Sequence, residues 1–153
     1  MVLNQPNCQF IPRAFVLYPK YYDGKDYKET GQKFVVTNTA SFNHNTKIVG
    51  GEKNGTQDAI IKPGEKKEYV FQPEAKPLQI SCSYHGWMGG RVFALDHPFA
   101  AVTDKNGNFE IKNAPSDVEL TVIGWHEAKG DFHDAKMTFK KGDNPSLELK
   151  VKK

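Results

Sequence analysis

Short runs of alternating apolar and polar residues, separated by glycine and proline turns, most limit how this chain can fold. The chain shows no amphipathic helix of any length, so its regular structure is predicted to be strand. Up to residue 96 the runs predict strands at 8–18, 32–37, 46–49, 59–61, 65–71, 78–82 and 91–95. Many short strands joined by turns are typical of a β-sandwich.

Residues 8–31 lead to two expectations about this sandwich. Pro12 divides the first predicted strand, and proline is tolerated at sheet edges and bulges, so we expect 8–18 at an edge. Residues 19–31 are polar, with a turn predicted at Asp23-Gly24. Three tyrosines lie in this stretch: Tyr21, Tyr22 and Tyr27. We expect the stretch to be a packed loop rather than a surface that faces a partner.

The segment Ser81–Gly89 contains a cysteine, a histidine and a methionine at regular spacing: Cys82, His85 and Met88. Their side chains offer a soft thiolate, a borderline imidazole and a soft thioether. Two histidines and one cysteine, with a weakly bound axial methionine, make a blue-copper electron-transfer site. The spacing therefore predicts three of the four copper ligands in one loop, and the remaining ligand has to be a histidine from elsewhere.

His44 is the candidate for the missing ligand, because it follows the strand-like run 33–37. A ligand loop that closes between two strands of a sandwich can meet a histidine at the end of a neighbouring strand. Cys82 is predicted to point inward, since it lies on the same side of its strand as Leu78 and Ile80. A buried thiolate site needs that orientation.

Each predicted ligand also has a purely structural interpretation. The chain has two cysteines, Cys8 and Cys82, and in an oxidising compartment they can form a disulfide, which excludes a Cys82 thiolate ligand. A loop histidine such as His85 is usually polar surface, and Met88 can fill a gap in a core. The three residues together favour a metal site over these alternatives.

Three neighbours of the predicted ligands are candidates for supporting roles: Asn43, Asn45 and Trp87. The asparagines can orient His44 or the thiolate through hydrogen bonds, although asparagines in loops more often cap turns. Trp87 is expected to shield the metal or to face a partner; the alternative is a partly buried aromatic cap.

The other histidines show no recognised ligand spacing: His97, His126 and His133. We expect them to be surface or structural residues, with His126 at a strand end and His133 in a loop. A second metal site built from His126, Glu127 and His133 is an alternative, since zinc uses such ligands.

Catalysis, nucleic-acid binding and membrane spanning have little support in the sequence. There is no Ser-His-Asp signature, phosphate loop or nucleotide fingerprint, and Cys82 and His85 before a methionine fit a metal better than a nucleophile pair. We therefore expect no enzyme. The net charge of +3 is too small to imply nucleic acid. No apolar run reaches the roughly 20 residues of a membrane span, and no signal peptide is visible.

Residues 97–153 extend beyond the region of the predicted ligands. Phe99–Thr103 and Phe109–Ile111 flank an Asn-Gly turn, which predicts a hairpin. Further alternating runs predict strands at 118–125, 136–139 and 147–151. We divide the chain into 1–96 and 97–153. The second part is expected to pack on the first as one continuous body, because about 55 residues bury a core only marginally alone.

Several segments, taken in order, resemble a known family. A histidine after an Asn-rich strand end, followed by Cys-x-x-His-x-x-Met between two strands, looks like the cupredoxin family, and the ligand-loop spacing is similar to that of amicyanins. Nearly the whole chain resembles plastocyanin/azurin-like domains of uncharacterised bacterial proteins, mostly predicted to be periplasmic and some labelled methylamine-utilisation-like. The shared segments are Cys8–Pro12, His44-Asn45, Cys82–Met88, Asp96–Thr103 and Trp125–Glu127. In two departures, Arg13 replaces a histidine of many relatives, and residues 18–31 look like an insertion.

The resemblance implies a Greek-key cupredoxin β-sandwich with a C-terminal β module similar to carboxypeptidase-regulatory or prealbumin-like domains. It implies one type 1 copper, with His44, Cys82 and His85 as equatorial ligands and Met88 as the axial ligand. It also implies one-electron transfer between Cu(I) and Cu(II) with an unidentified redox protein partner, in the periplasm or after export. The alternative functions are a copper storage or delivery module without a redox partner, and a metal-free interaction domain stapled by a Cys8–Cys82 disulfide.

Overall fold

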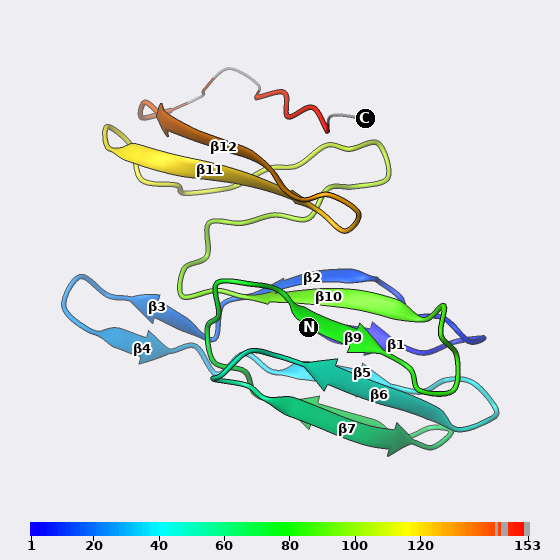
Figure 1. The fold of residues 1–153 in the computed structure, drawn as a ribbon. Coiled ribbons are helices and arrows are strands. Elements are labelled where there is room, and N and C mark those ends of the chain that lie inside the picture. The colour runs from blue at the N-terminus through cyan, green and yellow to red at the C-terminus, as the bar shows by residue number, and fades with distance from the viewer. Residues whose placement is uncertain (143, 145–146, 152–153) are drawn as a thin grey trace. The chain divides into compact units, whose positions relative to one another are not determined.

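The protein is described by a computed structural model, which covers residues 1–142, 144 and 147–151. The chain forms two compact units, Met1–Glu110 and Ile111–Lys153. Every regular element among the described residues is a strand, from β1 to β12 in chain order (Figure 1). The all-β fold class predicted from the sequence is therefore confirmed.

Two sheets make up most of the first unit. The smaller sheet has the order β1 (Val2–Asn4), β5 (Phe34–Thr37) and β8 (Lys66–Tyr69). The larger sheet has the order β2 (Ala14–Leu17), β10 (Gly89–Ala94), β9 (Leu78–Ser81), β6 (His44–Val49) and β7 (Thr56–Ile61). In these two sheets β1 pairs in parallel with β5 and β2 with β10, whereas the other pairs are antiparallel.

The core of the first unit is formed by the inward faces of these strands. Buried and more exposed residues alternate along most of them, as the two-residue period of a strand requires. Fully or almost fully buried residues include Leu17, Val36, Ile48, Leu78, Ile80 and Val92. The ring of Phe15 in the larger sheet meets the ring of Phe34 in the smaller sheet edge-on, with 5.1 Å between the centroids. The two sheets thus pack as a sandwich, which fixes the loops at its ends.

The N-terminal strands differ from the sequence prediction. β1 was not predicted, because a run of three residues is too short to show alternation. Within 8–18 the strand is confined to Ala14–Leu17, and it lies at the edge of the larger sheet, as Pro12 suggested. The residues before it form a loop instead, because Asn7 and Cys8 have φ values of 45° and 57°, a left-handed conformation that strands do not contain.

Residues 19–31 form a hairpin, so the prediction of a packed loop was wrong. β3 (Lys20–Tyr22) pairs with β4 (Tyr27–Glu29) around the predicted turn, where Asp23 Oδ1 accepts hydrogen bonds from the backbone N–H groups of Lys25 and Asp26. Two of the tyrosines pack on each other: the rings of Tyr22 and Tyr27 lie 5.5 Å apart, and both residues are exposed. The Tyr27 hydroxyl also donates to Asp96 Oδ2 at 3.4 Å.

The second unit contains one antiparallel pair, β11 (Glu119–His126) and β12 (Gly130–Thr138). The strands predicted at 118–125 and 136–139 are therefore present, with shifted ends. β12 also includes residues 132–134, so the loop expected there was wrong. The division at 96/97 and the packing of 97–153 on the sandwich remain predictions.

Three further strands expected in 97–153, the two of the hairpin and 147–151, are absent from the described residues. The turn after Thr103 exists, since Asp104 Oδ1 accepts from the N–H groups of Asn106 and Asn108, but the flanking residues form no strand pair. Their apolar side chains stay partly exposed, and a short two-stranded ribbon that buries little is only marginally stable. Residues 147–151 also form no strand.

Candidate metal centre

The topology of the larger sheet brings the predicted ligands to one end of the sandwich. His44 is the first residue of β6, and Cys82 directly follows the last residue of β9. β6 and β9 are antiparallel neighbours, so the start of β6 and the end of β9 lie at the same end of the sheet. His85 and Met88 belong to the loop that runs from Cys82 to β10, which we call the ligand loop (residues 82–88).

The side chains of His44, Cys82 and His85 converge on one point. One ligand atom from each, a ring nitrogen or the sulfur, lies within 4.8 Å of the others. Cys82 Sγ is 3.7 Å from His85 Nδ1, and the two imidazole centroids are 5.5 Å apart. Cys82 points inward and is 4% exposed, His44 is fully buried, and His85 is partly exposed. Three of the four predicted ligands thus come together.

The hydrogen bonding of His44, as well as its position, is consistent with a metal ligand. Both of its ring nitrogens are buried, and neither has a hydrogen-bond partner among the described residues. Buried polar groups are almost always hydrogen-bonded, and an unsatisfied one costs about 1–3 kcal/mol. Burial, and then the charge of His85, lower the pKa of His44, which favours the neutral ring with a free lone pair. A metal ion bound by that lone pair would satisfy the buried group.

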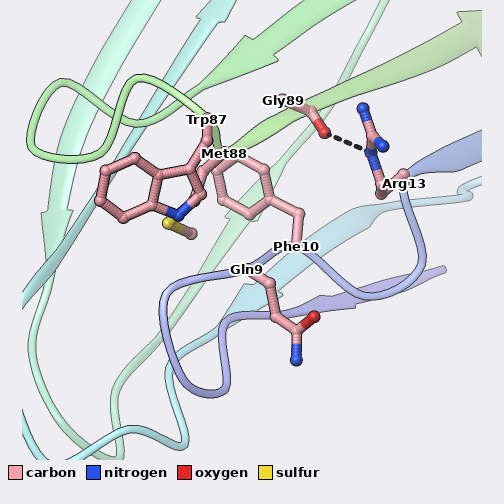
Figure 2. A pocket seen from close by; sticks show the side chains of 6 residues that line it. All are labelled: Gln9, Phe10, Arg13, Trp87, Met88 and Gly89. Atoms are coloured by element: carbon pink, nitrogen blue, oxygen red, sulfur yellow. Dashed lines mark hydrogen bonds between the residues drawn. The ribbon is translucent and has the colours of Figure 1, made fainter.

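Met88 is buried close to the same loop, but its role as the axial ligand remains a prediction. It is 3% exposed, and its backbone N–H donates to the carbonyl of His85, which closes a tight turn. Figure 2 shows Met88 and Trp87 lining a small pocket together with Gln9, Phe10 and Arg13. The methionine therefore lies where residues before β2 meet the ligand loop.

Asn45 ties β6 to the ligand loop. Its Oδ1 accepts a 2.9 Å hydrogen bond from the backbone N–H of Ser83, and its Nδ2 donates to the carboxylate of Asp58. These bonds go to Ser83 and Asp58, so the predicted role of Asn45 in orienting His44 or the thiolate remains a prediction. Asn43, the other candidate, is exposed.

Two aromatic rings flank the histidines. The Phe42 ring is 5.0 Å from that of His44, and the Trp87 ring is 5.1 Å from that of His85. Trp87 is nevertheless 72% exposed, so it covers His85 on one side only and leaves most of its own surface free. Its indole N–H donates to the carbonyl of Cys8.

Cys8 also lies beside His85, a contact that sequence reasoning missed. Cys8 Sγ is 3.5 Å from His85 Nε2, whereas Cys82 Sγ faces Nδ1 of the same ring. Both cysteines are free thiols, and the imidazole has a sulfur at each of its nitrogens. A disulfide requires about 2.05 Å between sulfurs, so the ring would have to move for one to form. The spacing of Cys8 in the sequence carries no signal of this contact.

The remaining histidines form no metal cluster in the described part of the chain, where His44, Cys82 and His85 are the only such group. His97 Nδ1 accepts a hydrogen bond from the N–H of Phe99, and His126 Nδ1 accepts one from Ala128. These are structural roles, as expected. The side chain of His133, part of the alternative zinc site, lies outside the described residues.

No protein-family model and no curated protein sequence matches this chain. A search of solved structures finds cupredoxins. A purple cupredoxin from Nitrosopumilus maritimus shares 17% identity over 61% of this chain and 97% of its own, with a TM-score of 0.45. Two amicyanin mutants, one a Cu(I) form and one reduced, share 16% and 18% identity over 61% of this chain and 80% of theirs, each with a TM-score of 0.47.

These likenesses are to cupredoxins, the family that the sequence resembles, and each has a TM-score below 0.5. In addition, the described residues contain no helix long and apolar enough to cross a membrane.

Proposed function

We propose that this chain is a type 1 copper protein that carries out one-electron transfer. The observation that carries the proposal is the buried convergence of one cysteine with two histidines, one of them with both ring nitrogens unpartnered in the described structure. Thiolate and imidazole are ligands that copper accepts, and a set of two histidines and one cysteine is characteristic of electron-transfer sites.

The chain's own groups prepare the site for a metal ion. Cys82 has to lose its proton to act as a ligand, and the partner charge for its thiolate comes from the metal. Burial lowers the pKa of His44, which favours its neutral ring, and the residue is fixed at the start of β6. Copper bound by these residues would supply a one-electron couple between Cu(I) and Cu(II). Met88, as a weak axial ligand, would tune that couple.

Electron exchange needs a route to the surface, and His85 is the ligand that provides one. It is partly exposed and lies against the exposed ring of Trp87, whereas His44 and Cys82 are buried. A redox protein that docks over this end of the sandwich would come close to the metal without contacting it. The chain would thus act as a carrier rather than an enzyme, in the periplasm or outside the cell.

Cyclic voltammetry of the copper-loaded protein tests this function. We expect one reversible one-electron wave, together with electron self-exchange that broadens the NMR signals of half-oxidised samples. The Cys82→Ser variant is the control and should lose the wave. Tight binding of Cu(I) without a reversible couple would contradict electron transfer and would favour copper storage or delivery.

A further inference from the structure

The His85 imidazole has a cysteine sulfur at each of its two nitrogens. Nδ1 lies 3.7 Å from Cys82 Sγ, and Nε2 lies 3.5 Å from Cys8 Sγ. Cys82 belongs to the proposed copper site. Cys8, which lies near the N-terminus, has no role in that site so far.

Cys8 is held against His85 by contacts on both sides of its loop. The backbones of Asn4 and Ile11 exchange two hydrogen bonds, of 2.8 and 2.9 Å, which close the loop around Cys8. The indole N–H of Trp87 donates to the Cys8 carbonyl at 3.1 Å. Cys8 is half-buried and packs against the hydrophobic core. Its position is therefore set by the fold and not by a freely moving side chain.

The residues that follow this loop are hydrogen-bonded to β10, which begins directly after the ligand loop. Figure 2 shows the Arg13 side chain directed at the carbonyl of Gly89, to which its Nε donates at 3.2 Å. The backbone carbonyl of Arg13 accepts from the N–H of Arg91. The residues before β2 are thus hydrogen-bonded both to Trp87 in the ligand loop and to the start of β10. The Cys8–His85 contact lies between residues of these same segments.

We propose that Cys8 is a positioning residue for the metal centre: its sulfur accepts a hydrogen bond from Nε2–H of His85. The inference rests on the proposed function. A neutral imidazole carries one N–H and one lone pair, and the metal needs the lone pair. A proton kept on Nε2 leaves the lone pair on Nδ1, the nitrogen that faces Cys82.

A thiol is an unusual group for this task. Histidines that bind metals generally donate their other N–H to a carboxylate, a backbone carbonyl or water, and this bond fixes the tautomer and the ring orientation. In this chain a half-buried sulfur takes that place at Nε2 of His85. The opposite polarity, with the Cys8 S–H donating to Nε2, would put the ring proton on Nδ1 and block it as a ligand.

Two variants distinguish the hydrogen bond from simple packing. Cys8→Ala removes the acceptor and keeps the backbone, so we expect Cu(II) affinity to fall roughly 10- to 100-fold, the usual loss when such a partner of a metal-binding histidine is removed. Cys8→Ser keeps an acceptor oxygen of similar size and should recover part of that loss. Competition with a chelator measures both affinities. Equal affinity in wild type and Cys8→Ala would contradict the positioning role.

The deciding test uses the metal-free full-length chain and ¹⁵N NMR of its histidine rings, at a pH where imidazole is neutral. We expect Nε2 of His85 to carry the proton in the wild type and in Cys8→Ser, and this proton to exchange with water several-fold faster in Cys8→Ala. A proton on Nδ1 in the wild type, or unchanged exchange in Cys8→Ala, would overturn the inference.

This readout needs no copper, so it separates the inference from the proposed function. An absent Cys8–His85 hydrogen bond contradicts the inference even where copper binds. A Cu(II) titration without a thiolate band contradicts the proposed function even where the hydrogen bond is present.

Discussion

At the scale of single residues, the site is defined by a buried histidine without hydrogen-bond partners in the described ranges and a buried free thiol. Both nitrogens of His44 lack partners in the described structure, and Cys82 is buried without a disulfide. Burying such groups without partners costs free energy, and binding a metal ion offsets that cost. Removal of the metal should therefore leave a folded but less stable sandwich.

Substitution of Met88 by glutamine tests the axial role at this scale. We expect Met88→Gln to keep the bound copper and to lower its reduction potential, because an amide oxygen is a harder ligand than a thioether and favours Cu(II). Voltammetry and visible absorption of both proteins measure the change. Complete loss of copper would mean that Met88 does more than tune the metal, and an unchanged potential would mean that it is not a ligand.

Tyr69 gives a prediction about pH. Its buried hydroxyl has no hydrogen-bond partner in the described part of the chain, and burial, followed by the charge of Asp58, raises its pKa to about 12. The unfolded phenol ionises near its ordinary pKa of 10.0. Between these values the folded state holds a proton that the unfolded state has lost, so the free energy of unfolding falls as the pH rises.

The Tyr69→Phe variant isolates this effect. Above the ordinary phenol pKa it should lose less stability than the wild type, by at most about 2–3 kcal/mol, since one pKa unit corresponds to about 1.4 kcal/mol. At neutral pH the variant should be at least as stable, because the removed hydroxyl was unsatisfied. Urea unfolding of both proteins at several pH values measures the difference. Parallel pH profiles would show that Tyr69 is not responsible.

Residue types and spacing explain how much of the site could be predicted. Cys82, His85 and Met88 lie close together in the sequence, and their donor chemistry points to copper without any knowledge of the fold. His44 could be added because it follows a strand. Cys8 could not be placed, because its contact with His85 depends on a left-handed turn and on a loop closed by backbone pairing.

At the scale of elements, the loops of the sandwich depend on close strand contacts. Gly90 in β10 faces the backbone of Arg13: a Cβ atom there would lie 2.9 Å from the Arg13 carbonyl oxygen. That oxygen accepts the N–H of Arg91, so it cannot shift without weakening the β2–β10 pair. The glycine therefore allows the edge strand to approach β10 directly after the ligand loop.

Alanine at this position is predicted to destabilise the protein. Gly90→Ala should lower the free energy of unfolding by about 1–3 kcal/mol, the usual cost of overpacking. Gly89→Ala is the matched control, since the nearest atom to its Cβ would be 4.0 Å away. Chemical denaturation of the three proteins checks the difference. Equal losses from both substitutions would contradict the close-approach argument.

The sequence predicted the longer strands better than the irregular segments. Alternation revealed the strands of the sandwich between residues 32 and 95, because one face of each is buried. The hairpin of β3 and β4 was not predicted because residues 19–31 are mostly polar, and its tyrosines Tyr22 and Tyr27 pack on each other. Around Asp104 the expected turn forms, but the residues on either side of it form no strand pair. These flanking residues bury little apolar surface, since their apolar side chains stay partly exposed.

At the scale of the whole molecule, all four predicted ligands and Cys8 belong to the first compact unit, Met1–Glu110. A chain that ends at Glu110 should therefore fold and give the same copper spectrum as the full chain. Visible absorption and thermal unfolding of the two chains check this. Loss of the copper spectrum in the shorter chain would contradict a self-contained site.

The thermal unfolding of the same two chains also tests the expected packing of 97–153 on the sandwich. An unchanged melting temperature would indicate that residues 111–153 add no stability to the first unit. A lower melting temperature in the shorter chain would support the packing.

Cys82 is proposed to bind copper as a thiolate, together with His44 and His85. A Cu(II) titration of the reduced protein, followed by visible absorption, tests this binding. We expect a strong thiolate-to-copper charge-transfer band that saturates at one equivalent and is missing in a folded Cys82→Ser variant. No band in the wild type, or an unchanged band in Cys82→Ser, would contradict a copper thiolate at Cys82.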